Sequence, residues 1–160
     1  MEGSRPAQRD PEDLTRVTHE TLPFAARTGI RIDVAERGRV RLTMPIEPNK
    51  NHVGTMYAGA LFTLAEIPGG TMSATTFDPK RFFPIVKDIQ IRFTRPALTD
   101  VSVEVSLTDP EIAAILSEAE ERGKADYSWE CELKDSSGAV VATARNLYQI
   151  RSRDLPMPTT

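Results

Sequence analysis

The stretch NHVGTMYAGALFTLAEIPGG, residues 51–70, decides the fold because most of it predicts a helix with one strongly apolar side. The residues on that side are Ala58, Leu61, Leu64, Ala65 and, just beyond the quoted stretch, Met72. Small residues at positions 59, 60 and 70 allow a neighbouring layer to approach closely. We therefore expect a central helix over residues 54 to about 76 that packs against an apolar surface.

Outside this helix, apolar and polar residues alternate with a period of two in six segments. Residues 30–34 and 40–46 form a hairpin that turns at the ERG tripeptide, residues 36–38. The later segments are centred on residues 89–93, 101–107, 127–133 and 140–144. Clean alternation is typical of an antiparallel sheet with one buried and one solvated face. The central helix is the expected cover of the buried face.

Two further helices are predicted from their end signals. Asp10 followed by Pro11 begins a short helical pattern that Gly29 ends, and Asp109 begins a second that ends at Gly123. Together with the strands they predict an α+β fold, in which a long central helix is wrapped by a curved antiparallel sheet of about six strands.

One domain is expected over residues 10–151, because 160 residues with 39% hydrophobic content suffice for one core but hardly for two. Residues 1–9 and 152–160 are polar and carry prolines, so we interpret both as flexible tails.

The composition excludes several partners and sites. A net charge of −3 gives no reason to expect nucleic acid or an anionic membrane surface. The sequence shows neither the apolar core of a signal peptide nor an apolar run that could span a bilayer, so a cytoplasmic protein is expected. One cysteine, Cys131, and two histidines, His19 and His52, cannot form a disulfide framework or a structural zinc site in one chain. No cofactor is predicted.

The order of these elements, and NHVGTMYAGALFTLAE in particular, resembles the hotdog-fold acyl-CoA thioesterases, notably the phenylacetate-pathway type and small bacterial thioesterases. Three other segments fall where that family has its second strand, its strand after the helix and its last hairpin. They are GRVRLTMPIEPNKNHVGT (38–55), KDIQIRFTRPAL (87–98) and GKADYSWECELKDSSGAVVA (123–142). The resemblance covers residues 12–151 and implies a hotdog fold, an acyl-CoA or related acyl thioester substrate, and coenzyme A only as part of that substrate.

The resemblance carries over residue by residue. The family pattern is Asn-x-x-Gly-Thr-x-His-Gly-Gly followed by a helical acid. The residues in register with it are Asn51, Gly54, Thr55, Gly59 and Glu66. Tyr57 and Ala58 depart from it, because many members have His-Gly there. The backbone N–H of residue 58 survives the change to alanine, so the resemblance still allows an oxyanion contact like that of the family. Tyr57 either replaces the histidine side chain or lines the pocket.

The chemistry of thioester hydrolysis requires a donor to the carbonyl oxygen and a group that delivers oxygen to the carbonyl carbon. The first turn of a helix offers free N–H groups, so the amides of residues 57–59 are candidate donors. Glu66 either positions or deprotonates water or attacks directly as a carboxylate, and the sequence leaves both roles open. Asn51 completes the set of candidate catalytic residues. The candidate substrate-binding residues are His52, Gly54, Thr55, Tyr57 and Phe62.

The spacing of these groups has a consequence for assembly. Ala58 and Glu66 are separated by about 12 Å along a helix axis, too far for both to contact one carbonyl group. A two-fold dimer that sets Glu66 of one chain against the helix start of the other resolves this. We therefore expect a homodimer, with a homotetramer as the larger alternative.

Pro68, Gly69 and Gly70 interrupt the helix directly after the acid. Proline has no N–H to donate to the carbonyl of Leu64, so we expect the helix to kink or loosen just past Glu66 and to open space for an acyl chain. The end of this pocket is expected among four aromatic residues, Phe62, Phe77, Phe82 and Phe83.

Structural roles compete with these functional ones. Glu66 could be a carboxylate held at a subunit interface, Asn51 a brace of its loop, Thr55 a helix cap and Tyr57 a packed aromatic residue with a solvated hydroxyl. His52 is expected to orient the loop. At the level of function, the alternatives to a thioesterase are a hotdog protein that binds acyl groups or a biosynthetic intermediate without hydrolysis, and a hotdog dehydratase or hydratase. Family members of the last kind rely on a catalytic histidine, which is missing at the helix start.

Overall fold

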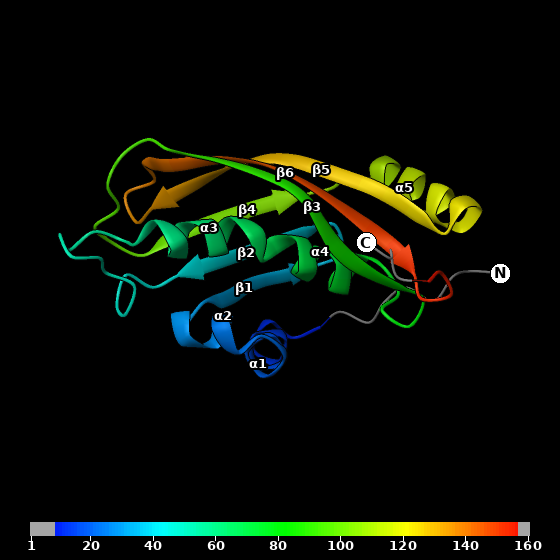
Figure 1. Cartoon of the computed structure of the whole chain (residues 1–160), viewed down its shortest axis with the longest axis horizontal. Helices are drawn as coiled ribbons and strands as arrows, with labels where there is room; N and C mark the ends of the chain where they lie inside the picture. The colour runs from blue at the N-terminus through cyan, green and yellow to red at the C-terminus, as the bar shows by residue number, and fades with distance from the viewer. Residues whose placement is uncertain (1–8, 157–160) are drawn as a thin grey trace.

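Six antiparallel strands form one sheet in the computed structural model, which describes residues 9–156 (Figure 1). The strand order is β1-β2-β4-β5-β6-β3, so β1 and β3 are the edges. The strands are β1 Arg31–Glu36, β2 Arg39–Met44, β3 Phe82–Phe93, β4 Val101–Ser106, β5 Lys124–Asp135 and β6 Val140–Ser152. The six predicted strands and the α+β class are confirmed.

A central helix of two segments, α3 (Ala58–Glu66) and α4 (Pro68–Thr76), covers one face of this sheet (Figure 1). The predicted start at residue 54 is wrong, because residues 51–57 form a loop. The Asn51 side-chain oxygen accepts hydrogen bonds from the N–H groups of Val53 and Thr55 at 3.0 and 3.1 Å. This local bonding competes with helix formation, and the helix begins only after Tyr57.

The helix is interrupted just past Glu66, as the proline predicts. Ile67 keeps a helical backbone between the two segments, but Pro68 has no N–H, and the Gly70 N–H bonds the carbonyl of Ile67, three residues back. Some carbonyls in the interior therefore lack their usual helical partners. Two buried side chains of β6 donate to such carbonyls, Asn146 Nδ2 to Ala65 O at 3.0 Å and Tyr148 Oη to Glu66 O at 2.9 Å. Tyr127 Oη of β5 donates to Gly69 O, inside α4, at 3.1 Å.

The remaining helices are α1 (Pro11–Thr21), α2 (Pro23–Thr28) and α5 (Asp109–Arg122). A single helix up to Gly29 was expected, but Pro23 divides it and leaves Leu22 between the segments with a non-helical backbone. Helix α5 begins as predicted, with Thr108 and Glu111 forming a capping box before the first turn.

The core lies between the helical layer and the inner face of the sheet. The inward stripes of β2, β4 and β5 are buried along their whole length. The stripe of β3 is less buried, and Phe93 at its end is 49% exposed, because β3 is an edge strand. Cys131 is buried in the inward stripe of β5, and burial raises the pKa of its thiol to about 11, as expected for an inert packing cysteine.

The structured chain extends past the predicted domain end at residue 151. Ser152 is the last residue of β6, and the N–H of Arg153 donates to the carbonyl of Arg81 at 2.9 Å. The predicted C-terminal tail therefore begins too early. The rest of the predicted tails, apart from residue 9, falls on residues 1–8 and 157–160, which lie outside the described residues.

The close approach of Gly69 to β6 gives a test of this architecture. A Cβ atom at residue 69 would lie 2.0 Å from Cε1 of Tyr148, whose ring is buried and hydrogen-bonded. Gly69→Ala should therefore destabilise the fold by about 1–3 kcal/mol through overpacking. Gly70→Ala is the matched control, because its Cβ would meet nothing within 4 Å, and it should gain up to about 1 kcal/mol of helix propensity. Urea unfolding measures both, and equal stability of the two variants would contradict the packing described here.

Candidate active site

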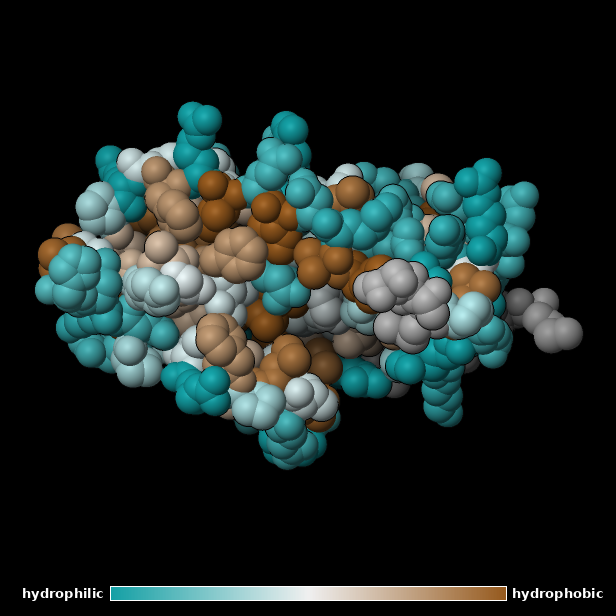
Figure 2. Space-filling view, in the orientation of Figure 1, coloured by the Kyte–Doolittle hydropathy of each residue, from teal (hydrophilic) through white to brown (hydrophobic). Residues whose placement is uncertain are grey.

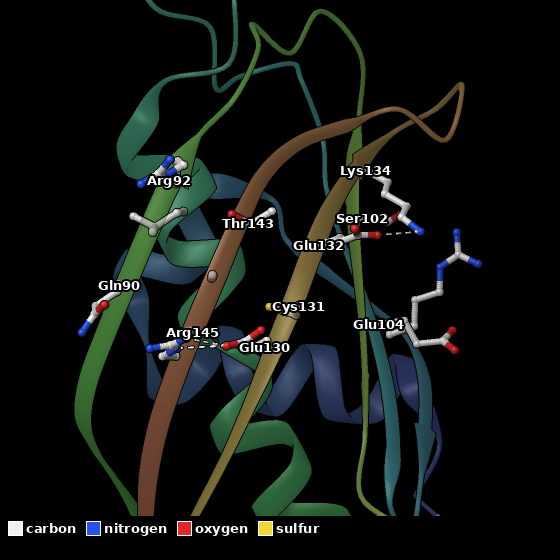
Figure 3. A pocket seen from close by; sticks show the side chains of 13 residues that line it. Gln90, Arg92, Ser102, Glu104, Glu130, Cys131, Glu132, Lys134, Thr143 and Arg145 are labelled. Carbon is white, nitrogen blue, oxygen red and sulfur yellow. Dashed lines mark hydrogen bonds and ion pairs between the residues drawn. The ribbon is translucent and has the colours of Figure 1, made fainter.

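Three hollows of the surface have volumes of about 1070, 530 and 450 Å³, and the largest of these is lined by charged residues of the sheet (Figure 3). Its acids and bases mostly point toward one another. Arg145 pairs with Glu130 at 2.7 Å and Lys134 with Glu132 at 3.2 Å, all four on the outward stripes of β5 and β6. Paired and exposed charges of this kind are typical of a solvated sheet face, so this hollow is a poor candidate for catalysis.

The smallest of the three is an apolar groove of about 450 Å³ along helix α3, which we call the α3 groove. Its residues come from α3, from the segment around α2 and from β3. They are Leu22, Phe24, Ala25, Gly59, Phe62, Thr63, Glu66, Ile67 and Val86. Apolar residues gather over α2 and β3 on this face of the molecule (Figure 2). Glu66 is the only ionisable group in the lining.

The floor of the α3 groove is one side of the helix. Gly59, Phe62, Thr63 and Glu66 follow the spacing of three and four residues that places side chains on a common face. The Thr63 hydroxyl donates to the carbonyl of Gly59 at 2.8 Å, so it is already paired within the helix. The groove therefore offers a ligand mainly apolar contacts, one carboxylate and the backbone at Gly59.

Glu66 is half-buried, and burial raises the pKa of its carboxyl group above the ordinary value of 4.5. No basic side chain among residues 9–156 forms an ion pair with it, and burial is the sole cause of the shift. A desolvated carboxylate without a counter-ion is a stronger base than a solvated glutamate, which suits a general base or a nucleophile.

The start of helix α3 presents two free amides. The N–H of Tyr57 donates to the carbonyl of Asn49 at 2.8 Å, so that candidate donor is already used. The N–H groups of Ala58 and Gly59 have no acceptor within residues 9–156, and no side chain caps the helix. Of the three amides expected to contact an oxyanion, these two are available, at the positive end of the helix dipole.

The loop before the helix is braced by Asn51. Its Nδ2 donates to the Thr55 hydroxyl at 2.9 Å, and its Oδ1 accepts the two loop N–H groups described above. Of the roles left open for Asn51, these hydrogen bonds correspond to the structural one, in which its side chain braces the loop. Thr55 does not cap the helix, as the simplest structural interpretation had it, because Tyr57 is the cap residue and the Thr55 side chain bonds within the loop. Gly54 has φ +83° in the same turn, and His52 is exposed.

Some of the candidate aromatic residues lie at the α3 groove and others lie in the hydrophobic core. Tyr57 is 60% exposed and its ring packs against Gly59, where a Cβ would lie only 2.5 Å from Cε1 of the tyrosine. Phe62 lines the α3 groove as predicted. Phe77 and Phe82 are buried in the core, with 1% and 3% of their surface exposed, so they do not end the groove.

Several residues of the site were missed in the sequence. Leu22 and Phe24 line the groove because Pro23 breaks the N-terminal helix and leaves them exposed beside α3. The sequence signal for this wall of the groove was a pair of large apolar residues, Leu22 and Phe24, on either side of Pro23. Asn146 and Tyr148 bond the interrupted helix from β6, and a signal existed here too. Asn146 continues the inward stripe of residues 140, 142 and 144, where an amide requires a buried partner.

Gly59 and Glu66 face the same groove but lie at different points along it. Seven residues separate them, which corresponds to about 10.5 Å along the helix axis. One thioester carbonyl cannot contact the amide of Gly59 and the carboxylate of Glu66 in the same chain.

Comparisons with known proteins agree with this architecture. A family model described as "Domain of unknown function (DUF4442)" matches residues 12–150. A Pseudomonas aeruginosa structure described as a "Probable Thioesterase" is 50% identical, with a TM-score of 0.86 over 94% of this chain and 100% of that chain. A Deinococcus radiodurans protein named "Putative esterase" is 28% identical over 84% of this chain and 87% of its own length. A Haemophilus influenzae thioesterase is 14% identical with a TM-score of 0.72, over 96% of this chain and 98% of that chain, and shows the fold alone.

Two further findings concern the described part of the chain, residues 9–156. None of its helices is long and apolar enough to cross a membrane. Within these residues, no three His, Cys, Asp or Glu side chains lie close enough together to hold a metal ion.

The raised pKa of Glu66 predicts a pH-dependent stability difference. The folded chain holds the Glu66 proton more tightly than the unfolded chain, so this residue lowers folded stability as the pH rises from 4.5 through the folded pKa. Glu66→Gln removes that effect. The variant should therefore gain stability relative to the wild type as the pH rises through this window, and the gain should level off above it. Urea unfolding between pH 4 and 8 measures the difference, and a difference independent of pH would argue against a desolvated carboxylate.

Proposed function

The chain belongs to the DUF4442 family of hotdog-fold, thioesterase-like proteins, and on that premise we propose that it hydrolyses acyl thioesters such as acyl-CoA to the free acid and the thiol. The observation that carries the proposal is the single desolvated carboxylate in an apolar groove that also reaches the free amides of a helix start. The apolar lining favours hydrocarbon or aromatic acyl groups over charged ones.

In this proposal the amides of Ala58 and Gly59 polarise the thioester carbonyl. They are unpaired, lie at the positive end of the helix dipole and need no rearrangement when negative charge develops on the carbonyl oxygen. Removing one such donor in other enzymes costs about 10²–10³ in kcat. The two amides therefore account for the electrophilic half of the reaction.

Glu66 supplies the other half in one of two ways. As a base it takes a proton from water, the water oxygen adds to the carbonyl carbon, the C–S bond breaks, and the proton passes to the departing sulfur. As a nucleophile it attacks the carbonyl carbon, expels the thiolate and forms an anhydride that water then opens. Both routes require the ionised carboxylate, so activity should fall on the acid side of a midpoint that lies above the ordinary glutamate pKa.

We further propose that each site is shared between two chains of a homodimer. The separation of Gly59 and Glu66 along α3 supports this, because a second copy brings an acid to the helix start of the first. Strand β3 is an open edge of 12 residues, and Phe24, Phe62 and Val86 beside the groove are exposed by 62%, 42% and 47%. An unpaired edge next to exposed apolar side chains favours pairing with another subunit. The cytoplasmic location expected from the sequence stays a prediction.

A non-hydrolytic acyl-binding protein is the alternative that one observation favours. Both polar atoms of the Asn51 side chain are engaged within its own loop, which leaves one N–H of Nδ2 as its remaining donor and favours a bracing role over a catalytic one. Such a protein would bind the same acyl groups in the α3 groove and release no thiol.

Thiol release from acyl-CoAs of several lengths and from an aromatic acyl-CoA tests the proposal. The wild type should release thiol, and Glu66→Gln should lower kcat by about 10²–10⁴-fold while it stays folded. Glu121→Gln is the matched control, because Glu121 is exposed on α5 and forms no ion pair within residues 9–156, and its rate should be unchanged. Binding of acyl-CoA without thiol release would support the non-hydrolytic alternative and refute the thioesterase.

A further inference from the structure

The peptide group that follows the Glu66 side chain is held from two sides: its N–H, that of Ile67, keeps the helical bond to Thr63 O at 3.0 Å, while its carbonyl is held from β6. In an unbroken helix the N–H of residue 70 would bond the carbonyl of residue 66, but here it bonds Ile67 O. The hydroxyl of Tyr148 donates to Glu66 O at 2.9 Å and takes the place of that missing bond. Asn146 Nδ2 donates to the Tyr148 hydroxyl, also at 2.9 Å, so the hydroxyl is itself held in place.

The Tyr148 ring has little freedom to move. Only 1% of the residue is exposed, and Asn146 is fully buried. The ring stacks on Tyr127 with ring centroids 5.4 Å apart, and its centroid lies 5.0 Å from that of Trp129. Gly69 lies against Cε1 of the ring, with no room for a Cβ atom between them. Burial together with the nearby Glu66 raises the pKa of the Tyr148 hydroxyl, which therefore stays a donor over the whole range in which the protein would work.

We propose that Tyr148 is a positioning residue for Glu66, and that Asn146 orients the hydroxyl through which it acts. The direction of the Glu66 Cα–Cβ bond depends on the orientation of the peptide between residues 66 and 67. A helix fixes that orientation through bonds to both the N–H and the carbonyl of the peptide. At this break the N–H bond to Thr63 O remains, and the bond to the carbonyl comes from Tyr148. The proposal deepens the proposed function and rests on it for its kinetic consequence.

Tyr127 provides a matched comparison within the same cluster. Its hydroxyl is also buried and also donates to a backbone carbonyl of the interrupted helix, at 3.1 Å. That carbonyl belongs to Gly69, three residues beyond the acid. Replacement of either tyrosine by phenylalanine removes one hydroxyl and leaves one buried carbonyl without this partner. The two changes should differ in their effect on Glu66, and Tyr148→Phe should cost at least as much stability as Tyr127→Phe, because Gly69 lies inside α4 whereas the Glu66 carbonyl has lost its helical partner.

The experiment compares Tyr148→Phe with Tyr127→Phe in steady-state hydrolysis of an acyl-CoA that the wild type turns over. Tyr148→Phe should lower kcat by about 10–100-fold, because small displacements of a reacting group have effects of this size, while KM changes by less than about 3-fold. Tyr127→Phe should retain kcat within about 3-fold. Equal losses in the two variants, or a loss confined to KM, would overturn the positioning role.

A second readout does not depend on activity. The carboxyl carbon of Glu66 can be followed by NMR in protein labelled with carbon-13 glutamate and assigned by its absence in Glu66→Gln. Its titration midpoint should move toward that of an ordinary glutamate in Tyr148→Phe and stay in place in Tyr127→Phe. If the wild type hydrolyses no thioester, the proposed function fails, and this titration alone decides the inference. An unchanged midpoint in Tyr148→Phe would then refute it.

Discussion

The missing N–H of Pro68 is the constraint on which the rest of the structure depends. A proline in the middle of the central helix leaves carbonyls in the interior without helical partners, and an unpaired buried carbonyl costs about 1–3 kcal/mol. Asn146 and Tyr148 supply donors from the sheet to the carbonyls of Ala65 and Glu66, and Tyr127 adds one to Gly69 inside α4. Since small domains are stable by only about 5–15 kcal/mol, these bonds together make up a substantial part of the stability of the fold. They also explain why a glycine, Gly69, must face the sheet where the ring of Tyr148 crosses the helix.

The same interruption has a chemical consequence. It places the last residue of α3, Glu66, half-buried in an apolar groove without a basic partner among the described residues, and this raises its pKa. The free amides at the other end of α3 lie two helical turns away. One helix thus carries both halves of a hydrolytic site at a distance at which a single substrate carbonyl cannot use both. In our account a second chain brings the halves together, and the exposed apolar side chains of the groove and the open edge of β3 are the surfaces available for that association.

The sequence predicted the strands and the helix break because both depend on local patterns. Alternation of period two located all six strands, and Pro68 located the interruption. The prediction of the helix start at residue 54 was wrong, because the side-chain hydrogen bonds of Asn51 outweigh the helix propensity of residues 54–57. The groove wall at Leu22 and Phe24 and the donors from β6 depend on contacts between segments far apart in the chain, which periodicity does not encode. Within the candidate site, the register of Glu66 with the amides of Ala58 and Gly59 could be predicted, while their environment could not.

Complementation between two inactive variants tests the shared site most directly. Ala58→Pro removes one amide at the first helical position, where proline is favoured, and Tyr57 before it already has φ −60° and ψ 135°, which suit a following proline. Mixed with Glu66→Gln, it forms hybrid dimers in which one site combines an intact helix start with an intact acid. With random pairing the mixture should recover about a quarter of wild-type activity, although each variant alone should be at least about 100-fold less active than the wild type. Hybrid dimers of verified composition that show no recovered activity would contradict a site built from two chains.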